Sequence, residues 1–255
     1  MRILSFNIFE GGVGRIDPIC SVIREASADV VFIAETWDTE CFGQMAQKLN
    51  MEMFQAQSPT NPRGHVGLLS KWPIREAINF GPLDTRLTRA AIRAEIKTDS
   101  GTWGIVGVHL YPYETMENEQ IRLKELDAVL QMAEKFKGIQ HLIVGDFNAH
   151  HPQQIIDLQK ADPKIRDRVQ AHGGKIPRLV VKKLLENGYA DAHAIGREPA
   201  KWQNTFTTRF PELRVDYIFV PEAISGCIAD CTAFKPPLAR YASDHYPVLA
   251  QIRPT

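Results

Sequence analysis

Apolar positions along the chain recur with two periods, one typical of strands and one typical of helices. Eight short apolar runs predict strands: Ile3–Ile8, Asp29–Ala34, Val66–Ser70, Ala90–Lys97, Trp103–Leu110, Leu142–Val144, Val215–Val220 and Val248–Ile252. In Ala90–Lys97 apolar residues alternate with charged ones. Because parallel strands are usually buried on both faces, this alternation predicts a half-buried antiparallel strand.

Helical spacing of apolar residues appears between these runs. The first predicted helix has Asp17 as its N-cap and Pro18 at its first helical position. Further helices are predicted at Thr39–Leu49, Thr115–Lys137 and Pro177–Asn187, the last ending at Gly188. Strands and helices alternate without a linker, an internal repeat or a low-complexity tract, so the chain is expected to form a single compact α/β domain over residues 1–255 with two layers of sheet.

Composition narrows the function classes. The chain has 255 residues, with 30 Lys and Arg balanced by 30 Asp and Glu, so a polyanion must be met by local charge or by a metal ion. No apolar run is long enough to span a membrane, and no secretory signal is seen at the N-terminus. The expected location is the cytoplasm, where the four scattered cysteines would stay reduced thiols: Cys20, Cys41, Cys227 and Cys231.

The candidate chemistry lies where polar residues abut the apolar runs. These residues are Asn7, Glu35, His109, Asp146, Asn148, Asp216, Asp244 and His245. Taken alone, each could be a turn former, a helix cap or a structural histidine. Together they are hard to assign to structural accident, because α/β sheets place their sites at the ends of buried strands.

The residue types indicate a hard cation with acid–base chemistry. Carboxylate and amide oxygens suit Mg²⁺ or Mn²⁺, and the two histidines suit proton transfer near neutral pH. The chain has no His-Glu-x-x-His motif and no paired Cys-x-x-Cys, which argues against zinc. It also has no glycine-rich phosphate loop and no Gly-x-Ser-x-Gly motif, which argues against a nucleotide kinase or a serine hydrolase.

At this point the chain resembles the endonuclease/exonuclease/phosphatase superfamily of divalent-metal phosphoesterases. The matching segments occur in the family's order: Leu4-Ser5-Phe6-Asn7, Ile33-Ala34-Glu35, Val108-His109-Leu110, Gly145-Asp146-Phe147-Asn148-Ala149, Arg214-Val215-Asp216-Tyr217-Ile218 and Ser243-Asp244-His245-Tyr246-Pro247. The resemblance implies a four-layer α/β/β/α sandwich, with two packed mixed β-sheets flanked by helices. It also implies in-line attack of water on a phosphate ester.

The resemblance implies roles for individual residues. Glu35, with Asn7 and Asp244 nearby, would hold Mg²⁺ or Mn²⁺ against a non-bridging phosphate oxygen. His245, oriented by Asp216, would be the general base or the stabiliser of the phosphorane-like transition state.

The remaining roles concern water and the leaving group. Asp146 and Asn148 would position the attacking water and could hold a second metal ion. His109 would bond the phosphate or help to protonate the leaving group. One-metal and two-metal schemes both stay open.

The substrate is less constrained than the reaction. Abasic endonucleases of this superfamily usually carry Gln where Ala34 stands and Tyr where His109 stands, which argues against a dedicated abasic enzyme. The segment around 151–188 is predicted to be a basic insert. Within it, Lys160–Lys183 holds eight Lys and Arg against two Asp. This charge favours contact with a phosphate backbone, although a solvated helical surface would look the same.

Three functions therefore stay open. The first is a nuclease or general phosphodiesterase, expected to be a monomer acting on DNA or RNA. The alternative is a phosphatase or phosphodiesterase acting on a lipid head group, as sphingomyelinases and inositol phosphatases do, or on a small metabolite. A non-catalytic binding module is disfavoured, because it would have eroded site residues and here all of them are present.

Overall fold

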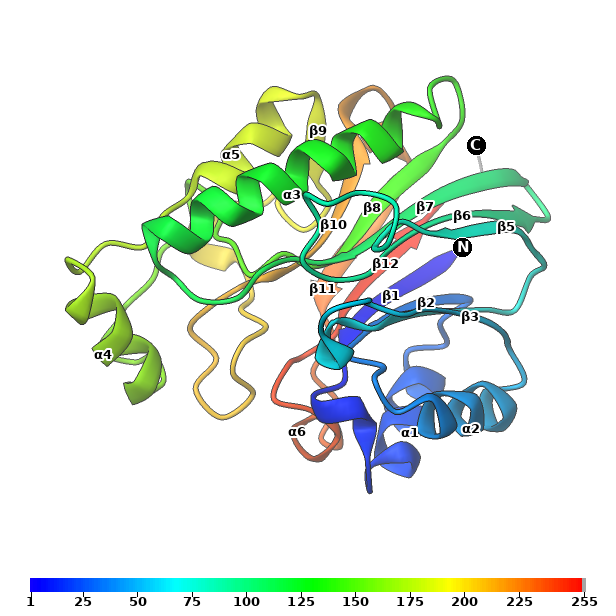
Figure 1. The fold of residues 1–255 in the computed structure, drawn as a ribbon, viewed down its shortest axis with the longest axis horizontal. Helices are drawn as coiled ribbons and strands as arrows, with labels where there is room; N and C mark the ends of the chain where they lie inside the picture. The colour runs from blue at the N-terminus through cyan, green and yellow to red at the C-terminus, as the bar shows by residue number, and fades with distance from the viewer. Residues whose placement is uncertain (254–255) are drawn as a thin grey trace.

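A computed structural model describes residues 1–253 and shows two six-stranded β-sheets packed face to face (Figure 1). The first sheet contains, in spatial order, β11 (Ile228–Ala233), β12 (Val248–Ile252), β1 (Arg2–Asn7), β2 (Val30–Ala34), β4 (Val66–Ser70) and β3 (Glu52–Ala56). The second contains β5 (Ile74–Asn79), β6 (Ala91–Thr98), β7 (Gly101–His109), β8 (His141–Asp146), β10 (Asp216–Pro221) and β9 (Tyr189–Asp191). Both sheets are mixed, because β1–β2 and β7–β8 pair in parallel whereas the other named pairs are antiparallel.

Helices cover both outer faces of the sheet pair. The first sheet packs against α1 (Ile16–Glu25), α2 (Thr39–Leu49) and the short α6 (Ala239–Ala242). The second packs against α3 (Met116–Glu134) and α5 (Leu179–Glu186). Between the sheets lies a third apolar core, which includes Phe32, Ile105 and Val144. The predicted four-layer α/β/β/α sandwich is confirmed.

All eight predicted strands are present, and the four strands that the pattern missed are the four edges of the sheets. These are β3, β5, β9 and β11. In β3, for example, Glu52 and Met53 are exposed and only Ala56 is buried. An edge strand pairs on one side only and buries little, so it lacks the dense apolar run that marks a central strand.

Local sequence explains where the helices begin. Thr115 caps α3 by accepting a hydrogen bond from the backbone N–H of Asn118 at 3.3 Å, and Asp38 caps α2 in the same way. The predicted cap of α1 was wrong. That helix begins at Ile16 with Arg15 as N-cap, and Asp17 lies in its first turn, where its side chain pairs with Lys48 at 3.0 Å.

The segment 151–188 contributes α4 (Pro163–Ala171) as well as α5. Ile165 and Val169 of α4 form a small separate core with Leu213 and Val215. This core anchors α4 beside the start of β10. Among residues 1–253, no helix is long and apolar enough to cross a membrane.

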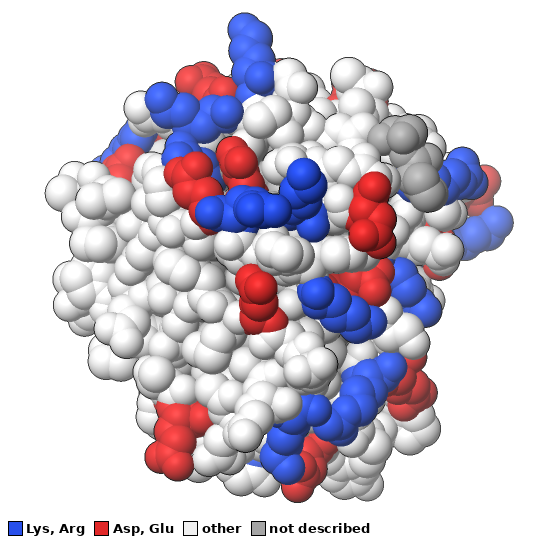
Figure 2. Space-filling model, turned by 90° about the vertical axis from the view of Figure 1, so that its right-hand side faces the viewer, with Lys and Arg blue, Asp and Glu red and all other residues white. Residues whose placement is uncertain are grey.

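The balance of charge extends to the surface. At the end of the sandwich where β1 begins, Lys and Arg side chains lie beside Asp and Glu side chains, and a broad area carries neither (Figure 2). This face therefore shows no large field of one sign. Any attraction for a polyanion has to come from another part of the molecule.

Candidate active site

The ends of the central strands bring the predicted polar residues to one edge of the two sheets. Asn7 ends β1, Glu35 directly follows β2, His109 ends β7 and Asp146 ends β8. Asp216 starts β10, and because β10 runs antiparallel to β8 with Asp216 opposite Asp146, its start lies at the same edge. The topology alone therefore gathers residues that are far apart in sequence.

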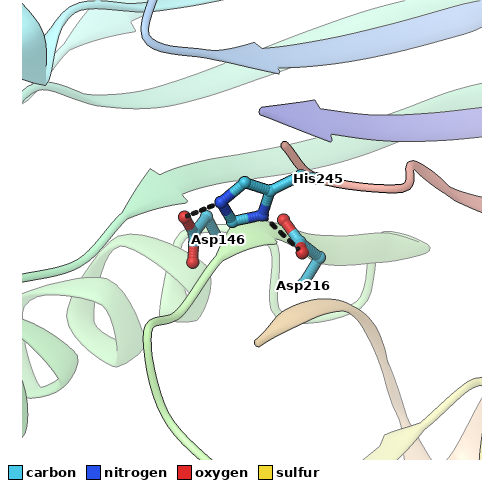
Figure 3. A group of neighbouring side chains, drawn as sticks. All are labelled: Asp146, Asp216 and His245. Carbon is cyan, nitrogen blue, oxygen red and sulfur yellow. Dashed lines mark hydrogen bonds and ion pairs between the residues drawn. The ribbon is translucent and has the colours of Figure 1, made fainter. Parts of the chain in front are cut away.

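His245 lies between two buried carboxylates at this edge (Figure 3). Its Nδ1 is 2.9 Å from Asp216 Oδ2, and its Nε2 is 3.9 Å from Asp146 Oδ2. The backbone N–H of His245 donates to Ser243 Oγ at 3.0 Å, and Ser243 Oγ in turn donates to the carbonyl of Asn7 at 2.7 Å. These bonds tie the loop before β12 to the end of β1 and so fix the imidazole.

The charges of this group determine its protonation. Burial alone would lower the pKa of His245, but the charge and hydrogen bond of Asp216, with further help from Asp244 and Asp146, raise that pKa to about 10. Burial and the negative charge of Asp216 raise the pKa of Asp146 to about 7. At neutral pH the site thus holds an imidazolium beside a carboxylate that can accept a proton.

Asn7 bridges two carboxylates with its amide nitrogen. Its Nδ2 donates to Asp146 Oδ2 at 3.0 Å and to Glu35 Oε1 at 3.3 Å, while its Oδ1 accepts from the backbone N–H of Phe9 at 2.9 Å. The side chain therefore lies where it was predicted. It presents its nitrogen, and not its oxygen, to the acidic groups.

Asp244 faces the same space as Glu35. Burial raises the pKa of Asp244, and the negative charge of Glu35 raises it further. Glu35 is held in a left-handed backbone conformation, with φ 65°, and its Oε2 accepts from the backbone N–H of Glu10 at 2.8 Å. Two negatively charged carboxylates in one pocket repel each other, and this repulsion is relieved when a cation lies between them.

His109 and Asn148 flank Asp146. His109 Nε2 lies 3.5 Å from Asp146 Oδ2, and burial, together with the charge of Arg89, holds the pKa of His109 well below its usual value. The backbone N–H of Asn148 donates to Asp146 Oδ1 at 2.9 Å. Gly145 allows the close pairing of β7 and β8 that sets His109 opposite Asp146, because a Cβ there would lie 1.9 Å from the carbonyl oxygen of Val108.

These residues open onto a pocket of about 380 Å³. Of the predicted residues, the pocket is lined by Asn7, Glu35, His109, Asp146, Asn148, Asp244 and His245. Asp216 does not line it and lies behind His245. The volume is within the range of small-molecule sites, about 300–1,000 Å³.

Sequence reasoning missed Arg89, which lines the pocket. Burial lowers the pKa of Arg89, and the negative charges of Asp146 and Glu35 oppose that shift. Its Nη1 donates to the carbonyl of Leu110 at 3.0 Å. The sequence did contain a signal that could have placed Arg89 at this edge. Arg89 precedes the apolar run of β6, and the start of an antiparallel strand lies at the same edge as the end of its neighbour β7.

The basic insert is mostly neutralised within the chain. Its ion pairs are Lys160–Asp157, Arg166–Asp167, Arg168–Glu114, Lys182–Glu186 and Lys183–Asp127. Arg178 instead donates to the carbonyls of His151, Pro152 and Gln154, and so holds a loop. Only Arg168 of this set lines the pocket. The formal charge of the segment therefore overstates what it presents to a polyanion.

Comparisons with known proteins agree with this geometry. A model of the endonuclease/exonuclease/phosphatase family matches residues 4–245, and the chain belongs to that family, whose members hydrolyse phosphoester bonds and generally depend on divalent metal ions. A search of curated proteins returned no significant match.

Several solved structures share the fold. An AP endonuclease from Archaeoglobus fulgidus superposes with a TM-score of 0.75 at 20% identity, covering 99% of each chain. The 3'-5' exonuclease NExo from Neisseria meningitidis gives 0.69 at 19% identity, covering 99% of this chain and 100% of that one. A humanized D. rerio TDP2 gives 0.67 at 20% identity, covering 98% and 97%.

Proposed function

We propose that this protein is a divalent-metal-dependent phosphodiesterase that hydrolyses DNA or RNA by in-line attack of water. The observation that carries the proposal is the position of His245, held between Asp216 and Asp146 at the end of a pocket that Glu35 and Asp244 also line. A cationic donor, a proton acceptor and a pair of metal-type ligands thus face one space. That combination suits attack on a phosphate ester.

The residues present fit Mg²⁺ or Mn²⁺. Glu35 and Asp244 supply carboxylate oxygens. Burial raises the pKa of Asp244, the positive charge of His245 opposes that shift and the negative charge of Glu35 adds to it, so a cation between the two carboxylates would favour their charged forms. Such an ion, when bound, would withdraw charge from a non-bridging phosphate oxygen. Asn7 would join the ligands only if its amide turned its oxygen toward Glu35, because its nitrogen now faces the carboxylates.

Asp146 is the proposed general base. Its raised pKa of about 7 gives it the affinity to accept a proton from the attacking water, and Asn148 and Asn7 fix its two oxygens. His245, whose pKa is about 10, keeps its proton and donates a hydrogen bond to the phosphate oxygen that gains charge. The P–O bond to the leaving group breaks as the water oxygen bonds to phosphorus, and the leaving oxygen takes up a proton from water in the pocket. Of the two roles left open for His245, the charges around it favour the stabiliser.

Asp216 and His109 have supporting roles in this scheme. Asp216 fixes the ring of His245 through Nδ1, so that Nε2 is turned toward Asp146 and the pocket. His109 is neutral at pH 7, so it serves as a hydrogen-bond partner of the phosphate and not as a permanent cation.

The arginines near the pocket favour a polynucleotide. Arg63, Arg89 and Arg168 line it. Arg63 and Arg168 are paired with Glu10 and Glu114, whereas Arg89 has no ion pair among residues 1–253 and is the one proposed to meet a phosphate that flanks the scissile one. The similar structures include a 3' phosphatase NExo from Neisseria bound to product DNA hairpin, at 18% identity and with a TM-score of 0.70. The single domain over residues 1–255, the monomeric state and the cytoplasmic location stay predictions.

The test is hydrolysis of a 5'-labelled oligonucleotide and of bis-p-nitrophenyl phosphate with Mg²⁺, with Mn²⁺ and with EDTA. We expect the parent to cleave both esters only with metal. The Asp146→Asn variant should lose on the order of 10²–10⁴-fold in kcat, the span of a positioned general base. The exposed Asp99→Asn is the matched control and should match the parent. Full activity in EDTA, or an active Asp146→Asn variant, would reject the mechanism.

A further inference from the structure

Two aromatic rings stand exposed at the same pocket, one after a strand of each sheet. Phe9 follows β1 and Tyr113 lies beyond the end of β7, and both line the pocket. Phe9 is 39% exposed and Tyr113 is 51% exposed. An exposed ring is common on a protein surface, but two rings beside a cluster of buried charges call for an explanation.

Each ring is covered on one side by an arginine. The guanidinium of Arg168 lies 4.5 Å from the ring centre of Tyr113, and that of Arg15 lies 5.4 Å from the ring centre of Phe9. Arg168 is itself fixed by buried Glu114, to which its Nε and Nη2 are bonded at 2.8 Å. Each ring thus has an arginine over one face and still keeps a large exposed fraction that a ligand can cover.

The backbone holds both rings in place. Phe9 and Tyr113 have left-handed conformations, with φ 53° and 74°, which non-glycine residues rarely adopt. Buried Arg122 donates to the carbonyl of Tyr113 at 2.7 Å, and Arg15 donates to that of Phe9. The Phe9 N–H is bonded to Asn7 Oδ1 at 2.9 Å. Because the backbone that carries each ring is fixed in this way, less conformational freedom is lost when a ligand stacks on the ring.

We infer that Phe9 and Tyr113 are stacking sites for the nucleobases that flank the scissile phosphate, so that the substrate is single-stranded or unpaired polynucleotide. This rests on the proposed function. A flat ring with one free face, backed by arginine, is the surface on which unpaired bases stack. A base inside a duplex is already stacked on both faces and cannot use it. The preference for single strands would thus come from the rings, and the cleavage itself from the cluster around His245.

The experiment compares two ligands with the same phosphates. One is a single-stranded oligothymidylate, and the other has every base replaced by a stable abasic sugar. We expect Tyr113→Ala and Phe9→Ala each to lower kcat/KM on oligothymidylate by on the order of ten-fold, mainly through KM, and to leave the abasic strand within about two-fold. Tyr113→Phe should keep the parent value. Tyr241→Ala, which removes a 73% exposed tyrosine outside the pocket, is the matched control.

A second measurement uses the duplex form of the same oligonucleotide. The parent should favour the single strand, and the Phe9→Ala/Tyr113→Ala double variant should lose most of that preference. Equal losses on base-bearing and abasic strands would overturn the inference and leave the proposed nuclease intact. Two outcomes would overturn both the stacking inference and the proposed nuclease. One is a parent protein that hydrolyses small phosphoesters but no polynucleotide, and the other is ring variants that lose activity only on phosphoesters presented in lipid vesicles.

Discussion

Two buried clusters are joined by the short segment from Arg214 to Asp216, yet the pKa values of their histidines are shifted in opposite directions. His245, Asp216 and Asp146 form the cluster that we propose to be catalytic, here called the catalytic cluster. The arginine cluster consists of Arg214, Asp191, His151 and His193. In the catalytic cluster the pKa of His245 is raised to about 10. In the arginine cluster burial, together with the charge of Arg214, lowers the pKa of His193 to about 4.

The sum of the surrounding charges explains the difference. Arg214 is paired with Asp191 at 2.6 Å, with the ring of Tyr217 4.5 Å away, so the arginine cluster has no negative charge to spare. His193 is accordingly neutral: its Nδ1 is 3.0 Å from the carbonyl of Cys231, and its Nε2 accepts from the N–H of Gln203 at 3.0 Å. The catalytic cluster has two carboxylates for one imidazole and opens onto the pocket. Burial of similar groups thus leaves a neutral histidine in one cluster and a protonated one in the other.

The largest expected effect comes from replacing one histidine of each cluster, His245 or His193, by asparagine. His245→Asn should lower kcat on the order of 10²–10⁴-fold, because it removes the proposed donor to the phosphate. His193→Asn, its matched control, should leave kcat within a few-fold and lower the free energy of unfolding. Steady-state kinetics and urea unfolding on both variants check this. Similar losses of kcat in both would show that the two clusters do not differ in function.

A double-mutant cycle sharpens the same comparison. Asp216 acts through His245, so Asp216→Asn combined with His245→Asn should cost little more in kcat than His245→Asn alone. Additive losses would mean that Asp216 has a role independent of the imidazole.

The next effect concerns stability. Asp191→Asn leaves Arg214 buried without its carboxylate and should cost about 3–5 kcal/mol in the free energy of unfolding. Asp230→Asn removes the exposed partner of Arg197 and should cost less than about 1 kcal/mol. Urea unfolding measures both. The Asp191→Asn/Arg214→Met double variant should recover part of the loss, and no recovery would show that the packing of the pair matters more than its charge.

The fold divides into strands that a sequence pattern can find and strands that it cannot. Central strands such as β2 are buried on both faces and read as uninterrupted apolar runs. Edge strands such as β9, with only Tyr189–Asp191, carry too few apolar residues to stand out, and pairing with β10 makes them strands. Tertiary context supplies what the local sequence lacks.

The candidate site divides in a similar way. The residues at strand ends could be found, because a polar residue after an apolar run is visible in the sequence. The charge of His245 could not, since it depends on Asp216 and Asp146, which the fold brings together from distant segments. Arg89 was missed because it is neither an acid, an amide nor an imidazole, although it precedes its strand as Asp244 and His245 precede theirs. The ion pair of Arg168 with Glu114 likewise could not be predicted, because the two residues are distant in sequence and only the fold brings them together.

The metal concentration that the protein needs for hydrolysis should change by a smaller factor. Glu35→Gln should raise the Mg²⁺ concentration for half-maximal hydrolysis by roughly 10–100-fold, with partial rescue by excess Mn²⁺, because one anionic ligand is lost but Asp244 stays. Glu198→Gln on the exposed surface is the control. Titration of activity against metal concentration checks it, and an unchanged midpoint in Glu35→Gln would remove this residue from the ligand set.

The smallest effect is a pH dependence of stability that belongs to the arginine cluster. The pKa of His193 is about 4 in the folded protein, below its unfolded value of ~6.5, so between these values the unfolded chain binds more protons. The stabilisation from keeping His193 neutral is complete above pH ~6.5 and is lost as the pH falls toward 4. Near pH 5 the loss amounts to about 2 kcal/mol. A proton on Nε2 would also face the N–H of Gln203, which needs an acceptor there.

Urea unfolding at pH 7 and pH 5 should therefore show a smaller drop in the free energy of unfolding in His193→Asn than in the parent. The surface variant His172→Asn, which alters an exposed ring, should keep the parent's drop. If His193→Asn loses as much stability between the two pH values as the parent, the acid sensitivity arises elsewhere, and the contrast between the clusters is not one of protonation.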